Sequence, residues 1–136
     1  MKYRFIDDLT SDVMFEAYGK SMKDLFENAA EALFSVMCQT DRVKKTVEKE
    51  VSVSAKNPSE LMFNWLQELI GIVDTDGIFL SGFKITKITG RSLKAVCTGE
   101  EADPKKGKTV VKAVTKYGYA FRKTAKGYVV RASLDI

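Results

Sequence analysis

The chain has 136 residues, a length that suits one domain with its own hydrophobic core. It carries 22 lysines and arginines against 18 aspartates and glutamates, for a net charge of +4, and it contains no histidine. The missing histidine excludes Ser-His-Asp and Cys-His nucleophiles and every zinc site that needs a histidine ligand. Any bound metal is therefore expected to be a hard ion held by oxygen atoms, such as Ca²⁺, Mg²⁺ or Mn²⁺.

Cysteine usage and hydropathy indicate the compartment. Cys38 and Cys97 are too few for a disulfide framework or a metal knuckle, so we expect both to be buried thiols. No apolar run approaches the ~20 residues that span a bilayer. The first residues also lack the apolar core of a secretory signal. We therefore expect a cytoplasmic protein that does not enter the membrane.

The N-terminal segment combines strand patterns with an acidic loop. Residues 1–5 and 14–18 have the alternation of short strands with one buried face. A loop rich in side-chain oxygens lies between them, and such a loop either turns the chain or holds a hard cation. Its oxygen-bearing residues are Asp7, Asp8, Thr10, Ser11 and Asp12.

Two helices are predicted, each with its own start signal. Ser21 and Asp24 have the spacing of a capping box, and apolar residues then recur at helical spacing to Met37. A second helix starts with an asparagine cap followed by proline at 57–58 and extends to about residue 72. Its apolar face includes Trp65, the only tryptophan, which we expect in the core.

The remaining segments predict strands and turns. Residues 47–55 alternate as a half-buried strand between the helices, residues 74–77 form a turn, and residues 99–108 form the longest loop. Further strands are predicted at 78–80, 83–89, 92–98, 110–115, 117–122 and 128–134. This order predicts a single α+β domain over residues 1–136, with two helices packed on one face of a mixed, largely antiparallel sheet.

The last residues add carboxylates to those of the acidic loop. Asp135 is followed by the terminal carboxylate of Ile136. If the first and last strands are neighbours, Asp12 meets these groups, and converging carboxylates repel one another unless a cation binds among them. In the alternative, Asp8 and Asp12 cap turns and Asp135 is solvated. Lys112 interrupts an apolar strand; it either faces solvent or contacts a phosphate or a partner's carboxylate.

With these residues identified, the chain resembles the archease family over essentially its full length. The family's Asp-His-Thr-Ala-Asp loop corresponds to residues 8–12, where Leu9 replaces the histidine and Ser11 the alanine. A Lys-Ala-Val/Ile-Thr strand corresponds to residues 112–115, and a C-terminal Ile-Leu-Asp-Ile to residues 133–136. The loop aspartates and the C-terminal aspartate are therefore retained, whereas the loop histidine is not.

The resemblance implies a non-enzymatic activator of the RtcB-type RNA ligase that seals tRNA halves after intron removal. Such proteins promote GTP-dependent guanylylation of the ligase and its multiple turnover. The resemblance also implies a divalent metal ion, with Asp12, Asp135 and the terminal carboxylate of Ile136 as ligands. By the same resemblance, Asp8 and Thr10 shape the loop and Lys112 takes part in activation.

Other functions stay open at this point. The family resemblance also implies a chaperone-like modulator of a tRNA methyltransferase. The basic clusters at 42–49, 105–116 and 122–126 are compatible with an RNA-binding accessory protein, and direct contact with tRNA is undecided. A metal-dependent phosphoesterase or nuclease is disfavoured, because such an enzyme needs a base or a second metal beside these few carboxylates.

Overall fold

The computed structural model describes residues 1–7 and 12–136, which form seven strands, two α-helices and two short 3₁₀ helices within that part of the chain. In chain order they are β1 (Tyr3–Ile6), β2 (Val13–Gly19), α1 (Met22–Met37), η1 (Thr40–Arg42), β3 (Val47–Ser54), α2 (Pro58–Asp76), β4 (Ile78–Ile88), β5 (Ser92–Glu101), η2 (Pro104–Lys106), β6 (Ala113–Thr124) and β7 (Gly127–Asp135).

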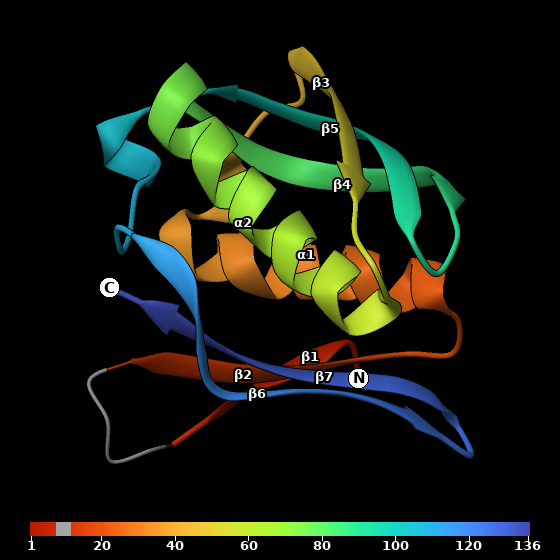
Figure 1. Ribbon diagram of the computed structural model, residues 1–136. Helices are drawn as coiled ribbons and strands as arrows, with labels where there is room; N and C mark the ends of the chain where they lie inside the picture. Colours follow the sequence, from red (N-terminus) through yellow and green to blue (C-terminus); the bar gives the residue numbers. More distant parts are fainter. Residues whose placement is uncertain (8–11) are drawn as a thin grey trace.

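The described strands form two antiparallel sheets, and the two helices lie between them (Figure 1). One sheet has the order β1-β2-β7-β6 and the other β3-β5-β4. The α+β class and the packing of two helices on antiparallel strands are confirmed. The strands, however, are divided between two sheets, because buried residues surround more than one side of α1 and one sheet cannot cover them all.

Both helices begin where the sequence predicts. The Ser21 hydroxyl accepts a hydrogen bond from the backbone N–H of Asp24 at 3.1 Å. The Asn57 side chain does the same for Glu60 at 2.9 Å, with Pro58 at the first helical position. Each cap satisfies a backbone donor that has no partner inside the helix, so the two starts are fixed locally.

The end of α2 differs from the prediction. The helix does not stop at residue 72 but continues through Asp76, so the turn predicted at 74–77 is wrong. Gly77 ends the helix with a φ of 63°, and its N–H donates to the carbonyl of Val73. Three polar residues in a row do not break a helix, whereas a glycine in the left-handed region does.

The later strands are longer than predicted. The strands expected at 78–80 and 83–89 are one strand, β4. Its pairing with β5 continues across the residues between them with a register shift between Leu80 and Gly82. β5 extends to Glu101, and η2 occupies part of the predicted loop. β6 begins only at Ala113, so Lys112 lies just outside the strand rather than within it.

The core connects the helices with both sheets. Trp65 is fully buried, as predicted, and its indole N–H donates to the carbonyl of Phe26 on α1 at 3.0 Å. Cys38 and Cys97 are buried free thiols, also as predicted, and burial raises their pKa values to about 11 and about 12. Within residues 1–7 and 12–136, neither helix is both long and apolar enough to cross a membrane.

Candidate functional site

The sequence-predicted residues that the structure describes meet at one end of the four-stranded sheet. β2 starts there, β7 ends there and β6 starts there, with Val13 opposite Leu134 and Ala113 opposite Asp135. Extending the first register by one residue puts Asp12 opposite Asp135. The backbone N–H of Lys112 donates to the Asp135 carbonyl at 2.7 Å. We call Asp12, Lys112, Asp135 and Ile136 the strand-end cluster.

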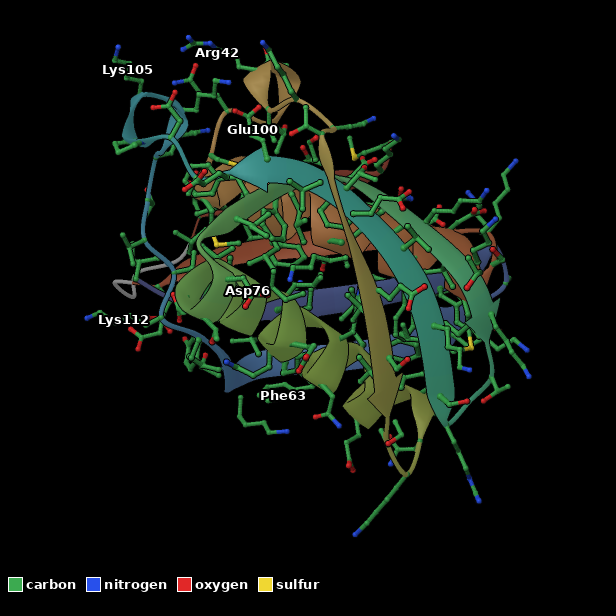
Figure 2. All side chains as sticks on the ribbon, turned by 90° about the horizontal axis from the view of Figure 1, so that it is seen from above. Arg42, Phe63, Asp76, Glu100, Lys105 and Lys112 are labelled. Atoms are coloured by element: carbon green, nitrogen blue, oxygen red, sulfur yellow. The ribbon has the colours of Figure 1, made fainter. Side chains whose placement is uncertain are left out.

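The members of the strand-end cluster differ in exposure. Asp12 and Asp135 are half-buried, whereas Lys112 is exposed and Ile136 is 41% exposed. Figure 2 shows the Lys112 side chain pointing away from the body of the protein. Asp8 and Thr10 lie outside the described residues.

The strand-end cluster offers oxygen donors suited to a hard cation. Opposed residues of an antiparallel pair have Cβ atoms about 4.5–5.5 Å apart, so two aspartates there repel each other and a divalent cation would relieve that repulsion. Among the described residues, no group of three or more His, Cys, Asp or Glu side chains gathers as a metal site. The sequence prediction adds the terminal carboxylate of Ile136 as a third donor.

A second charged site, which the sequence did not reveal, lies further along the same face. Glu16 in β2 is only 5% exposed although it points away from the helices. Its Oε1 accepts from Nη2 of Arg4 at 3.0 Å and from the Tyr18 hydroxyl at 2.8 Å. Its Oε2 accepts from Nε and Nη2 of Arg131 at 3.1 and 2.7 Å. The Tyr18 hydroxyl also accepts from Nε of Arg4 at 2.7 Å.

These contacts hold the Glu16 carboxylate in its ionised form. Burial by itself raises the pKa of Glu16, but the hydrogen bonds from Arg131, Tyr18 and Arg4 together outweigh it, and the pKa falls below its usual value of 4.5. Burial and the adjacent Glu16 carboxylate raise the pKa of Tyr18 above 10.0. The phenol therefore stays protonated and keeps donating to Glu16 at neutral pH.

An irregular part of β6 lies over the row of residues between these two sites. The β6–β7 register is interrupted between Thr115 and Ala120. There the Ser133 hydroxyl donates to the Tyr117 carbonyl at 2.9 Å, and Gly118 has a φ of 63°. The Thr115 hydroxyl is buried beside them without a hydrogen-bond partner among the described residues. This segment covers the middle of the outer face and leaves the two charged sites separate.

The same irregular segment is anchored to α2. The ammonium group of Lys116 lies 3.7 Å from the ring centroid of Phe63, a cation–π contact. The Tyr119 hydroxyl donates to the carbonyl of Ser59 at 2.7 Å, and burial raises the pKa of Tyr119 above 10.0. These contacts fix the segment from the helix side, so its position does not depend on the strand ladder alone.

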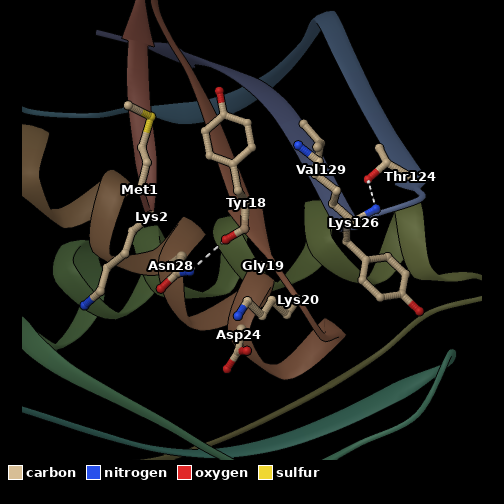
Figure 3. A pocket seen from close by; sticks show the side chains of 11 residues that line it. Met1, Lys2, Tyr18, Gly19, Lys20, Asp24, Asn28, Thr124, Lys126 and Val129 are labelled. Atoms are coloured by element: carbon tan, nitrogen blue, oxygen red, sulfur yellow. Dashed lines mark hydrogen bonds between the residues drawn. The ribbon is translucent and has the colours of Figure 1, made fainter.

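A cleft of about 520 Å³ opens at the end of the sheet opposite the strand-end cluster (Figure 3). Tyr18 and Val129 line it, and the Asn28 amide donates to the Tyr18 carbonyl at 2.7 Å. Three lysines border the cleft: Lys2, Lys20 and Lys126. Asp24 also borders it, and Lys2 pairs with Glu31 at 3.1 Å, so the positive charge of the cleft is partly offset.

A smaller apolar cleft, of about 280 Å³, lies near Lys112. It is formed where the ends of α1 and α2 meet the segment before β6, and Val110 on its rim is 75% exposed. The neighbouring residues are held in place, because Thr109 donates to the Val36 carbonyl at 3.0 Å and Val111 is buried. Val110 is thus presented outward on an anchored segment.

Glu16 left only a weak trace in the sequence. It is a single charged residue between Phe15 and Ala17, and such a residue is normally solvated. Its ion-pair partner Arg131 lies 115 residues away, so only the pairing of β2 with β7 brings the two together. The alternation of the sequence predicts that Glu16 lies on the outer face of its strand. It does not predict that arginines from other strands cover the carboxylate there.

Comparisons with known proteins agree over nearly the whole chain. The family model described as "Archease protein family (MTH1598/TM1083)" matches residues 3–136. The protein archease of Methanosarcina acetivorans is 34% identical over 141 aligned residues, which cover 99% of this chain and 96% of that protein. The solution structure of Methanobacterium thermoautotrophicum protein 1598 is 33% identical, covers 98% of both chains and superposes with a TM-score of 0.83. A crystal structure of an archease from Thermotoga maritima is described as that of a possible chaperone. It is 23% identical, and the match covers 98% of this chain and 97% of that one. Its TM-score of 0.70 shows a shared fold.

Proposed function

This chain belongs to the archease family, and from that premise we infer that it is a protein cofactor rather than an enzyme. It activates an RtcB-type RNA ligase by promoting GTP-dependent guanylylation of the ligase and its multiple turnover. The observation that carries the proposal is the strand-end cluster. Strand pairing brings Asp135 beside the position of Asp12 and fixes Lys112 next to them, although these residues come from opposite ends of the chain.

Within this proposal, Asp12, Asp135 and the carboxylate of Ile136 hold a divalent cation. The donor set is all oxygen, which suits Ca²⁺, Mg²⁺ or Mn²⁺. The cation would supply positive charge that offsets the repulsion between the carboxylates. With the aspartates neutralised, the start of β2 and the end of β7 keep their positions, and the exposed ammonium group of Lys112 is presented to the ligase.

A guanylylation assay tests this proposal. Purified ligase, GTP and Mn²⁺ are combined with the wild-type chain, with Asp12→Asn or with a deletion of residues 135–136. The proposal expects wild type to accelerate nucleotide transfer and both variants to lose most of that effect. Asp74→Asn removes the same charge at an exposed position of α2 and should activate like wild type. Equal activation by Asp12→Asn and wild type would refute the role of the cluster.

Lys112 is tested in the same assay. Lys112→Ala should lower activation while leaving cation binding intact, because its backbone N–H, not its side chain, contacts Asp135. Lys105→Ala removes an exposed lysine from η2 and serves as the matched control. If both variants lower activation equally, the effect is one of general charge and Lys112 has no specific role.

The apolar cleft favours a second candidate, a chaperone-like modulator of a partner such as a tRNA methyltransferase. The exposed Val110 beside that cleft could contact an apolar segment of a partner protein. The Thermotoga maritima relative is described as a possible chaperone. Light scattering of an aggregating methyltransferase tests this function: wild type should suppress aggregation and Val110→Ser should not. Suppression without ligase activation would place this function first.

A further inference from the structure

Arginines are concentrated on the outer face of the four-stranded sheet, at a distance from the strand-end cluster. Arg4 and Arg131 lie on either side of Glu16, and Arg122 is exposed opposite Val129 in the next row. Three of the five arginines of the chain therefore lie on one face. We call Arg4, Arg122 and Arg131 the arginine face. With a rise of about 3.4 Å per residue, Arg131 is about 14 Å from Asp135 along β7.

Glu16 holds two of these arginines in fixed orientations and leaves them partly free. Arg131 uses Nε and Nη2 on Glu16, and Arg4 uses Nη2 on Glu16 and Nε on Tyr18. In both cases the Nη1 group is not used in these contacts. The two side chains are still 42% and 51% exposed. Each guanidinium is thus oriented in advance and keeps donors at the surface.

Stability alone does not account for this arrangement. Removing a carboxylate from water is costly, and apolar side chains in place of a buried ion-pair group are often as stable or more stable. Apolar residues would not, however, hold the guanidinium groups of Arg4 and Arg131 at fixed positions on the surface of the sheet. Arg4 and Arg131 lie on the strands that flank β2, about 9–10 Å apart across two strand spacings. The single negative charge of Glu16 leaves the pair with a net positive charge.

We propose that the arginine face binds the phosphodiester backbone of single-stranded RNA, with Arg4 and Arg131 as phosphate contacts. Guanidinium groups match phosphate oxygens in geometry and charge. Single-stranded RNA is favoured over an acidic protein because Tyr117, from the irregular segment next to this face, is 51% exposed and offers a ring on which a base can stack.

The large cleft extends this surface. It begins at Tyr18 and Val129, which share a row with Arg122, and its lysines continue the positive charge beyond the sheet. An RNA chain that contacts Arg131 and Arg122 therefore reaches Lys126 next. The proposal does not depend on ligase activation or on a cation, because the binding is a property of this chain alone.

Fluorescence anisotropy with a fluorescein-labelled single-stranded RNA of mixed sequence tests the proposal on the full chain. Arg131→Gln and Arg4→Gln should each weaken binding by about tenfold, as expected for the loss of a charged hydrogen bond. Each should also lower the slope of log K against log salt by about 0.7. Arg91→Gln makes the same charge change in the exposed turn between β4 and β5 and should change affinity less than twofold. An equal loss with Arg91→Gln would overturn the proposal.

Two further variants separate a positioned site from a merely basic surface. Glu16→Gln raises the net charge from +4 to +5, so a surface acting through charge alone would bind RNA more tightly. The proposal expects weaker binding, because Arg4 and Arg131 lose the group that orients them. Arg131→Lys keeps the charge but removes the planar guanidinium group that can donate two parallel hydrogen bonds to one phosphate. This variant should bind the RNA less tightly than wild type. Circular dichroism checks that each variant is folded at the assay temperature.

An acidic partner is distinguished in the same experiment. Poly-glutamate is added as a competitor at the same concentration of negative charge as the RNA. RNA that stays bound supports the proposal, whereas displacement by poly-glutamate assigns the face to an acidic protein and overturns it. Ligase activation is measured separately, so failure of RNA binding and failure of the proposed activation are distinguishable.

Discussion

Glu16 and Asp135 lie on the outer face of the same sheet, and their surroundings differ. Glu16 receives hydrogen bonds from Arg4, Tyr18 and Arg131, so this chain supplies the positive charge that a buried carboxylate needs. Asp135 is half-buried at the end of β7, and no salt bridge joins it to another described residue. In the proposed function, a divalent cation from solution binds beside Asp135 and Asp12 and offsets their charge.

The comparison shows that similar carboxylates on one surface can serve different purposes. At Glu16 the countercharge is part of the fold and is always present. At the strand-end cluster the proposed countercharge depends on the concentration of a divalent cation. The first arrangement can position arginines permanently, and the second can respond to the surroundings. Five predictions test this difference, from the largest expected effect to the smallest.

The largest effect is expected from divalent cations. A cation that binds only the folded chain raises the free energy of unfolding by about 2.7 kcal/mol at 100 times its dissociation constant. Thermal denaturation with Ca²⁺, Mg²⁺ or Mn²⁺ should show this stabilisation, and a chelator should reverse it. Asp12→Asn and Asp135→Asn should abolish it, whereas Asp76→Asn, at the end of α2, should not. If divalent cations stabilised Asp135→Asn as much as wild type, Asp135 would not differ from Glu16 in depending on a cation.

Loss of Glu16 should destabilise the protein by about 1–2 kcal/mol, because the arginines it pairs with are half-exposed and water screens them in part. Glu16→Gln, compared with wild type in urea at pH 7, measures this effect.

The effect of Glu16 should also depend on pH. The pKa of Glu16 is lower in the folded chain than its usual value of 4.5, so its contribution is complete above pH 4.5 and declines as the pH falls through the folded-state pKa. The difference between wild type and Glu16→Gln should therefore shrink on acidification below pH 4.5. A difference that grew instead would contradict the pairing of Glu16 with the arginines.

The irregular segment between the two sites should contribute less. Gly118 has a φ of 63°, so Gly118→Ala should destabilise the protein by about 1 kcal/mol through backbone strain. The new Cβ would lie 3.0 Å from the flexible end of Met14, a contact that a small movement relieves. Gly71→Ala is the matched control: it meets nothing within 4 Å inside α2 and should stabilise the helix. Chemical denaturation of both variants measures the two opposite changes.

The smallest effect is expected for the ion pair between Lys49 and Asp76, which are joined at 3.0 Å and about one-third exposed. Lys49→Met should change the free energy of unfolding by no more than about 0.5 kcal/mol. The urea midpoint of this variant gives a baseline for an isolated surface pair. If it matched the effect of Glu16→Gln, the Glu16 cluster would have no greater energetic weight than an ordinary surface contact.

The sequence alone predicted the features that depend on neighbouring residues. Ser21 and Asn57 cap the helices because their side chains reach backbone donors three residues away. Alternation predicted β2 and β3, and helical spacing placed Trp65 in the core. The resemblance further suggested that Asp12 and Asp135 act together.

Only the tertiary structure decided how these elements are combined. Local patterns give a strand its buried face but not its neighbours, so the division into two sheets and the position of the helices between them were not predictable. The pairing of β2 with β7 brings Arg131 to Glu16 across a separation of 115 residues, and the same register, continued by one residue, puts Asp12 opposite Asp135. Contacts of that range depend on the folded topology, and no local spacing in the sequence encodes them.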